Sequence, residues 1–182
     1  MNLTPVKKIV LTAVCMALCV VVPMAFHGVA NAGSVFLPMH IPVLMCGLIC
    51  GWPFGLICGL FGPLLSSFTG MPPMAVLPGM MVECAVYGAA AGACMQLIRT
   101  KHLYADLYIA LVVAMLAGRV ISGIAKALFL APGTSLAAWA TGAFVTGLPG
   151  IVIQLLLIPV LVSALMRARL IPARYPGRKN HE

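Results

Sequence analysis

The sequence predicts an all-α integral membrane protein, a single bundle of six transmembrane helices with both termini in the cytoplasm. Hydrophobic residues make up 63% of its 182 residues and charged residues only 8%, whereas about a quarter of the residues in a soluble domain are charged. The apolar residues form continuous runs rather than the alternating pattern of a β-barrel. Because a bilayer core about 30 Å thick takes roughly 20 residues per helix, a chain of this length accommodates about six spans.

Six apolar segments account for most of the chain. We expect spans at about 6–26, 37–51, 53–69, 79–98, 107–129 and 138–166, followed by a basic cytoplasmic tail over 167–182. The second span is short, and only Gly51, Trp52 and Pro53 join it to the third, so a re-entrant or tilted pair is the alternative there. No linker, repeat or low-complexity segment stands out, so residues 1–182 are interpreted as one membrane domain.

The first span also has features of a cleaved signal peptide. Lys7 and Lys8 precede an apolar run, and Ala30-Asn31-Ala32 matches an A-x-A cleavage site. The run of about 18 residues is longer than a usual signal core. Its removal would also leave five spans and break the charge pattern described next. We therefore interpret this segment as a retained transmembrane helix.

The basic residues are distributed as expected for cytoplasmic loops. Nine of the eleven Lys and Arg residues lie outside the apolar runs, namely Lys7, Lys8, Arg99, Lys101, Arg167, Arg169, Arg174, Arg178 and Lys179. With six spans these residues all lie on one side, whereas segments 27–36, 70–78 and 130–137 on the other side contain no Lys or Arg. The positive-inside rule places the basic side in the cytoplasm. The net charge of +8 therefore indicates orientation in the cell membrane, and we expect no nucleic-acid partner.

Small residues recur at the four-residue interval that lets two helices approach closely in lipid. They are Gly47, Gly51, Gly55 and Gly59, then Gly88 and Gly92, and in the first span Ala13 and Ala17. Packing within the bundle explains most of them. The A-x-x-x-A face of Ala13 and Ala17 suits a partner chain equally well, and the spacing alone does not choose between the two interpretations.

Two cations lie inside the fifth span, where a charge costs at least about 2.5 to 3.5 kcal/mol and usually faces a cavity or a partner. Arg119 and Lys126 are seven residues apart and therefore share one helix face. From the helical rise, Lys126 lies roughly 5 Å and Arg119 roughly 15 Å below the outer end of that span, and Glu83 lies about 6 Å below the outer end of the fourth span. His40 is at the level of Lys126, and Gln154 is deeper, near Arg119. These five side chains are candidate substrate-binding residues.

One interpretation of these charges is a buried structural ion pair between Glu83 and one cation. The other cation would then be unmatched, so a pocket at this place would carry a net charge near +1 and favour an anionic solute. A carboxylate fits best, because Arg binds it with two hydrogen bonds and Lys adds a point charge. Segment 70–78, stiffened by three prolines, is expected to cap the pocket, and segment 27–36 to act as a gate in which Asn31 offers hydrogen bonds to the solute.

The residue inventory argues against an enzyme. The chain has three acidic residues, Glu83, Asp106 and Glu182, which are too scattered for paired-carboxylate or two-metal catalysis. It also lacks the G-x-x-x-x-G-K-[ST] motif of ATPases. The seven cysteines lie in apolar spans without clustered His or acidic residues, so we expect no metal and no cofactor. A stand-alone proton-coupled secondary transporter is the alternative class, although the chain shows no clear inverted repeat.

The segment FLPMHIPVLMCGLICGWPFGLICGLFGPLLSS, residues 36–67, is distinctive. With this segment, the sequence resembles the substrate-binding subunits, or S components, of energy-coupling factor (ECF) vitamin transporters, and the segment is similar to their pantothenate-like branch. The resemblance covers most of the chain in size, span number and charge layout. Ala13 and Ala17 match the motif by which the first helix of that family docks on the T subunit. The resemblance implies an S-component-like six-helix bundle with the ligand in its outer half.

The function implied by this resemblance is vitamin capture. The chain would bind a small water-soluble vitamin from outside and topple beside a transmembrane T subunit, while two cytoplasmic ATPase subunits supply the energy. The resemblance transfers no list of site residues, so the candidate site depends on charge and depth alone. Surplus positive charge favours a carboxylate, with pantothenate first and niacin second. A neutral ligand such as hydroxymethylpyrimidine, pyridoxine, riboflavin or a queuosine precursor is the alternative if Glu83 neutralises Arg119.

Overall fold

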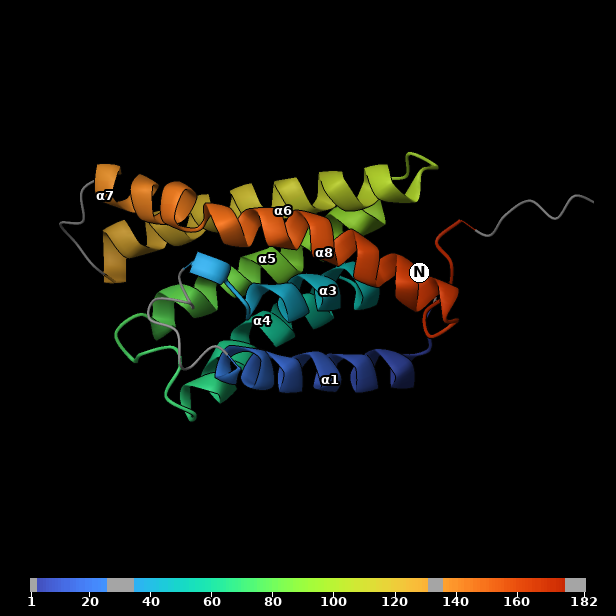
Figure 1. Cartoon of the computed structure of the whole chain (residues 1–182), viewed down its shortest axis with the longest axis horizontal. Coiled ribbons are helices and arrows are strands. Elements are labelled where there is room, and N and C mark those ends of the chain that lie inside the picture. The colour runs from blue at the N-terminus through green and yellow to red at the C-terminus, as the bar shows by residue number, and fades with distance from the viewer. Residues whose placement is uncertain (1–2, 26–34, 131–135, 176–182) are drawn as a thin grey trace, which may run out of the picture.

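The computed structural model describes residues 3–25, 35–130 and 136–175, and the regular structure in these ranges is helical throughout. The helices are α1 (Pro5–Met24), α3 (His40–Cys50), α4 (Trp52–Ser67), α5 (Leu77–Leu97), α6 (Leu103–Ala125), α7 (Leu136–Ala140) and α8 (Leu148–Arg167), with two π-helical segments, η1 (Lys126–Leu130) and η2 (Thr141–Thr146). They form an elongated bundle in which α3 lies between α1 and α8 (Figure 1). The predicted all-helical class is confirmed.

Helix length separates two groups within the described residues. Four helices are long and apolar enough to cross a membrane, namely α1, α5, α8 and α6 extended to Leu128. Helices α3 and α4 have 11 and 16 residues. At a rise of 1.5 Å per residue, α3 covers only about 16 Å, roughly half of a bilayer core. The helices therefore support a membrane-embedded protein, while six crossings and two cytoplasmic termini stay predictions.

A single residue separates α3 from α4. Gly51 has φ 98°, a conformation that side chains with a Cβ atom rarely adopt. The Gln96 amide also lies 2.7 Å from the place where a Cβ of residue 51 would stand. Because Gly51 satisfies both constraints, the chain reverses here without a loop, and the two short helices pack against the same face of α5.

Helix α5 is the centre of the bundle, because it packs against α3, α4 and α6. The closest approaches involve the glycines that the four-residue spacing singled out. A Cβ atom on Gly88 would contact the backbone of Gly55, and a Cβ on Gly47 or Gly55 would contact the carbonyl of Gly88. A Cβ on Gly92 would likewise contact the backbone of Trp52. These glycines therefore serve packing inside the bundle, as their spacing predicts.

We expect a Gly88→Ala substitution to destabilise the protein. The added methyl group meets backbone atoms rather than a flexible side chain, and overpacking of this kind costs about 1 to 3 kcal/mol. The apparent unfolding temperature of the purified protein in detergent measures the effect. Gly142→Ala is the matched control, because a Cβ at that position has no neighbour within 4 Å. Equal unfolding temperatures for the two variants would contradict the close packing of α4 on α5.

The last predicted span differs from the structure at one place. Residues 136–146 form α7 and η2, a turn at Gly147 interrupts the helix, and α8 begins at Leu148. Pro149 stands in the first turn of α8, where a backbone N–H has no partner within the helix. The expected continuous helix over 138–166 is therefore two consecutive segments, because Gly-Leu-Pro favours an end and a new start.

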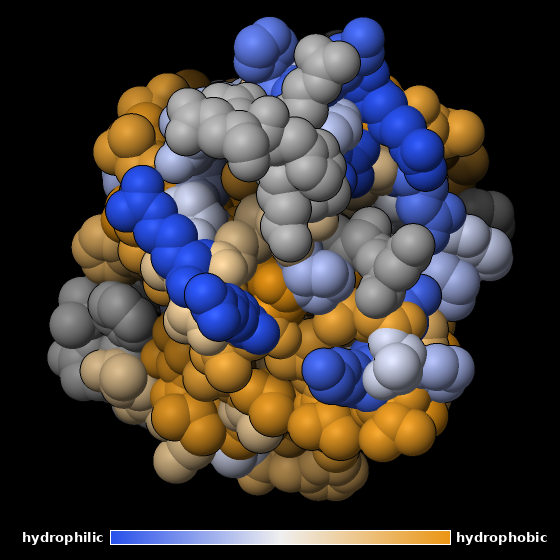
Figure 2. Space-filling model, turned by 90° about the vertical axis from the view of Figure 1, so that its right-hand side faces the viewer, coloured by the Kyte–Doolittle hydropathy of each residue, from blue (hydrophilic) through white to orange (hydrophobic). Residues whose placement is uncertain are grey.

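One end of the bundle, called the basic end below, collects the start of α1, the connection between α5 and α6, and the end of α8 (Figure 1). These segments carry Lys7, Lys8, Arg99, Lys101, Arg167, Arg169 and Arg174. Seen from this end, hydrophilic side chains lie across the face and hydrophobic side chains surround them (Figure 2). The helices thus bring together charges that are far apart in the sequence.

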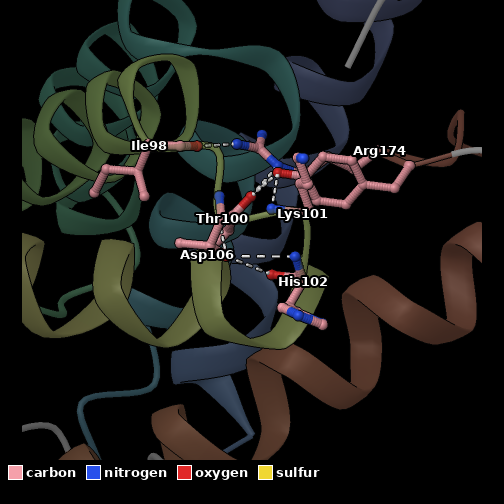
Figure 3. A network of polar contacts seen from close by, with 7 residues as sticks. Ile98, Thr100, Lys101, His102, Asp106 and Arg174 are labelled. Atoms are coloured by element: carbon pink, nitrogen blue, oxygen red, sulfur yellow. Dashed lines mark hydrogen bonds and ion pairs between the residues drawn. The ribbon is translucent and has the colours of Figure 1, made fainter.

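Asp106, near the start of α6, joins three segments of the basic end (Figure 3). Its carboxylate is fully buried and accepts hydrogen bonds from the Thr100 hydroxyl at 2.7 Å and the Thr100 backbone N–H at 2.8 Å. On its other oxygen, Arg174 Nε and the Tyr175 hydroxyl both donate at 2.5 Å. The Arg174 guanidinium also donates to the carbonyl of Ile98. The chain after α8 is therefore anchored to the α5–α6 connection.

Candidate functional site

Glu83 is the centre of a polar cluster formed by α3, α5, α6 and η1. Its Oε1 atom accepts a hydrogen bond from the Tyr87 hydroxyl at 3.2 Å and lies 3.8 Å from His40 Nε2. Its Oε2 atom lies 3.8 Å from Lys126 Nζ. The Tyr87 hydroxyl in turn accepts a hydrogen bond from Arg119 Nε at 3.0 Å. Four of the six candidate substrate-binding residues therefore meet around one carboxylate and one tyrosine, which we call the Glu83 cluster.

Helix geometry and two glycines allow this cluster to form. Glu83 and Tyr87 are four residues apart on α5 and therefore share a face. A Cβ atom on Gly118 of α6 would collide with the Tyr87 ring, and a Cβ on Gly79 of α5 would stand 2.6 Å from Lys126 Cε. Glycine at these positions leaves room for the tyrosine ring and for the stem of the lysine. Lys126 is also the first residue of η1, and such π-helical turns often occur at functional sites.

Arg119 is the buried cation of the cluster, with 3% of its surface exposed. Its side chain makes a single hydrogen bond to the described residues, from Nε to Tyr87, and forms no ion pair with them. The Phe144 ring lies 5.4 Å from its Cζ atom, a cation–π distance. Because Nε alone is hydrogen-bonded to a described residue, the two terminal nitrogens of the guanidinium offer a planar, two-pronged donor of the kind that binds a carboxylate.

His40 begins α3 and is 1% exposed. Its ring packs against Tyr87 with 5.1 Å between centroids. Neither ring nitrogen has a hydrogen-bond partner among the described residues. An unsatisfied buried polar group costs about 1 to 3 kcal/mol, and native proteins keep few of them without a functional reason. The imidazole therefore offers both a donor and an acceptor beside Glu83.

The remaining candidates differ in position. The Lys126 side chain is 37% exposed, so it lies at the edge of the cluster rather than inside it. Gln154 is buried, but its amide donates to the carbonyl of Leu37 at 3.5 Å and so ties α8 to the segment before α3. Its predicted role in substrate binding at the depth of Arg119 stays a prediction. Asn31 and most of the expected gate at 27–36 lie outside the described residues.

Sequence reasoning missed three aromatic residues of this region. Tyr87 connects Glu83 with Arg119, Phe144 of η2 packs against Arg119, and Trp139 of α7 packs edge-to-face on Phe144 with 6.0 Å between centroids. The Trp139 ring also contacts Gly123 of α6. The four-residue spacing of Glu83 and Tyr87 was a usable signal for the first of them. Nothing in the sequence indicated that 136–146 would fold over Arg119.

Helix α1 presents a second candidate surface. Its buried residues are Thr12, Cys15, Cys19 and Pro23, which share one face. Ala13 and Ala17 lie on the exposed face. That face also carries exposed Val6, Ile9, Val10, Val14, Leu18 and Val21. Ala13 and Ala17 are therefore not buried against other helices of the bundle, and they are accessible to a partner helix or to lipid.

Comparisons with known proteins identify the family. The family model for the substrate-specific component of ECF transporters matches residues 7–162. No curated protein and no solved structure matches the chain. The match includes every residue of the Glu83 cluster and both alanines of α1, and it covers far more than half of the sequence. The chain therefore belongs to the family of ECF transporter substrate-specific components.

Proposed function

We propose that this chain binds a small carboxylate-bearing vitamin, pantothenate first and niacin second, for ATP-driven uptake. Membership of the family supports a substrate-binding subunit rather than an enzyme. The observation that carries the choice of substrate is the charge of the Glu83 cluster. One carboxylate faces the cations of Arg119 and Lys126 there, so with a neutral His40 the cluster has a net charge of about +1. An anionic ligand would neutralise this net positive charge.

Each residue of the cluster has a distinct role in this proposal. Arg119 binds the carboxylate through its two terminal nitrogens, and Lys126 adds a second positive charge at the exposed edge. His40 hydrogen-bonds a hydroxyl or amide of the ligand, which satisfies its buried ring nitrogens. Glu83 and Tyr87 do not bind the carboxylate; they hold the cations in place. Phe144 keeps water from Arg119, which strengthens the ion pair with the ligand.

Energy for uptake comes from partner subunits in this proposal. Ala13 and Ala17 on the exposed face of α1 form the contact with a transmembrane T subunit, because small residues allow two helix backbones to approach closely. Two ATPase subunits on the cytoplasmic side then drive the cycle. The basic end faces these subunits if the six-span topology holds.

Two measurements test the proposal. Native mass spectrometry of the purified protein is expected to find a retained small carboxylate, whose dissociation constant is then measured. Uptake in cells is expected to require co-expressed T and ATPase subunits. Proton-driven uptake by the chain alone would instead establish a secondary transporter.

Bulky substitutions on α1 are expected to separate binding from transport. An Ala13→Trp, Ala17→Trp double variant should retain its dissociation constant for the ligand but lose most uptake, because two indoles prevent close contact with the T subunit. Leu116→Trp, at an exposed position of α6, is the control. Uptake that survives the double substitution would contradict the proposed docking surface.

A neutral vitamin is the second candidate, and the 37% exposure of the Lys126 side chain favours it. If Lys126 is solvated and Glu83 compensates Arg119, the cluster attracts no anion. A hydroxymethylpyrimidine, pyridoxine, riboflavin or queuosine precursor would then use Glu83 and His40 as hydrogen-bond partners. The mass of the retained ligand distinguishes the two candidates directly.

A further inference from the structure

The basic end contains a cavity that is separate from the Glu83 cluster. This cavity of about 200 Å³ opens between the start of α1 and the segment that follows α8. Its lining residues are Leu3, Thr4, Lys7, Arg169, Leu170 and Pro172. The six come from the two extremes of the described chain, so the cavity exists only because the segment after α8 folds back beside α1.

The charge of this cavity is uncompensated within the described residues. Lys7 and Arg169 line it, no acidic residue does, and neither cation forms an ion pair with another described residue. Asp106, the one described carboxylate of the basic end, already forms an ion pair with Arg174. The cavity also contains Thr4, the N-cap residue of the 20-residue helix α1, whose side chain makes no capping hydrogen bond. The positive end of the helix dipole adds to the two side-chain charges.

The backbone at Arg169 is held in an unusual conformation. Arg169 has φ 57° and stands just after α8, where Leu170 N–H bonds the carbonyl of Leu165 and Arg169 N–H bonds that of Met166. This is the Schellman pattern, in which glycine is the preferred residue at the left-handed position. An arginine is less favourable there than glycine. The position therefore carries a cation where helix termination alone would favour a glycine.

Apolar side chains next to the two cations suit a lipid headgroup better than a free ion. Leu3 and Leu170 line it beside the cations, and Leu170 is 61% exposed. The adjoining face of α1 exposes Val6 and Ile9, and hydrophobic side chains border the charged face in Figure 2. A phosphate in the cavity therefore has apolar surface next to it on which acyl chains can lie.

We propose that this cavity binds the phosphodiester of an anionic phospholipid. Lys7, Arg169 and the first turn of α1 contact the phosphate, and the acyl chains lie on the exposed apolar side chains beside the cavity, Leu170, Val6 and Ile9. Basic pockets at the cytoplasmic ends of transmembrane helices bind lipid headgroups in this way, and each cation near the surface contributes about five-fold in affinity. The site does not depend on the identity of the vitamin.

The test measures lipid retention by the full chain. Dioleoyl phosphatidylglycerol and dioleoyl phosphatidylcholine are titrated separately into the detergent-purified protein, and native mass spectrometry counts the bound lipids. The variants are Lys7→Gln, Arg169→Gly, both together, and Arg99→Gln as the control. Arg169→Gly removes the cation while supplying the residue that the backbone conformation favours, so the variant is expected to fold. Arg99 is an exposed cation of the same end outside the cavity.

We expect the wild type to prefer phosphatidylglycerol over phosphatidylcholine and the double variant to bind phosphatidylglycerol about 25-fold more weakly. Arg99→Gln should change that affinity less than two-fold. An unchanged affinity in the double variant, or an equal loss in Arg99→Gln, would overturn the proposal. Displacement of the lipid by an equal concentration of inorganic phosphate would also overturn it in favour of a free-anion site. Vitamin binding measured on the same variants should be unchanged, so failure of this site is distinguishable from failure of the proposed function.

Discussion

Replacing Arg119 with glutamine is expected to abolish high-affinity ligand binding. Arg119 is almost fully buried and has no carboxylate partner among the described residues. Removing one partner of a buried charge pair costs about 2 to 5 kcal/mol, which raises the dissociation constant at least about 30-fold. Isothermal titration of the purified variant with the vitamin identified by mass spectrometry measures this change. Arg119→Lys should recover little, because an ammonium group lacks the two-pronged geometry of guanidinium.

Two further variants test whether the loss of binding in Arg119→Gln arises from the loss of its charge. Lys126→Gln should weaken binding less than Arg119→Gln, because Lys126 is partly exposed and already paired with Glu83. Glu83→Gln should leave the affinity for a carboxylate unchanged or increase it, since the amide oxygen can still accept the Tyr87 hydrogen bond and the net charge of the cluster rises from about +1 to about +2. A strong loss in Glu83→Gln together with little loss in Arg119→Gln would reject the carboxylate and favour a neutral ligand. Unfolding temperatures of all variants exclude misfolding as the cause.

Replacing Arg174 with alanine is expected to destabilise the protein by about 3 to 5 kcal/mol, because it leaves the buried carboxylate of Asp106 without its ion-pair partner. The segment after α8 also loses its bond to Ile98. A lower apparent unfolding temperature and easier proteolysis of the tail by trypsin are the measurements. Arg167→Ala, an exposed arginine of the same end, should shift the unfolding temperature little.

A double variant separates the charge from the packing of the Arg174 side chain. Asp106→Asn removes the negative charge and retains an oxygen that can accept hydrogen bonds from Thr100. Combined with Arg174→Met, it should be more stable than Arg174→Ala alone, since no unpaired charge is then buried. Instability in the double variant equal to that of Arg174→Ala would assign the effect to packing instead.

The candidate site could be predicted in part because position along a transmembrane helix specifies depth. Lys126 and Glu83 were expected at the same level from the helical rise alone, and their charged atoms lie 3.8 Å apart. Glu83, with Arg119 and Lys126, was also conspicuous because charges are rare in apolar spans. Tyr87 carries no charge, so only its four-residue spacing from Glu83 singled it out in the sequence. Its role depends on the rotation of α5 against α6, which depth does not specify.

Composition and local pattern determined on their own that this chain is a helical membrane protein, which glycines lie where helices touch, and which end is basic. These properties depend on burial in lipid and on neighbours within a few residues. Only the tertiary structure decided that Asp106 joins the tail to the α5–α6 connection, that Tyr87 contacts Arg119, and that Phe144 packs against Arg119. Each of these depends on contacts between segments far apart in the chain, and such contacts produce no repeating pattern of residues in the sequence.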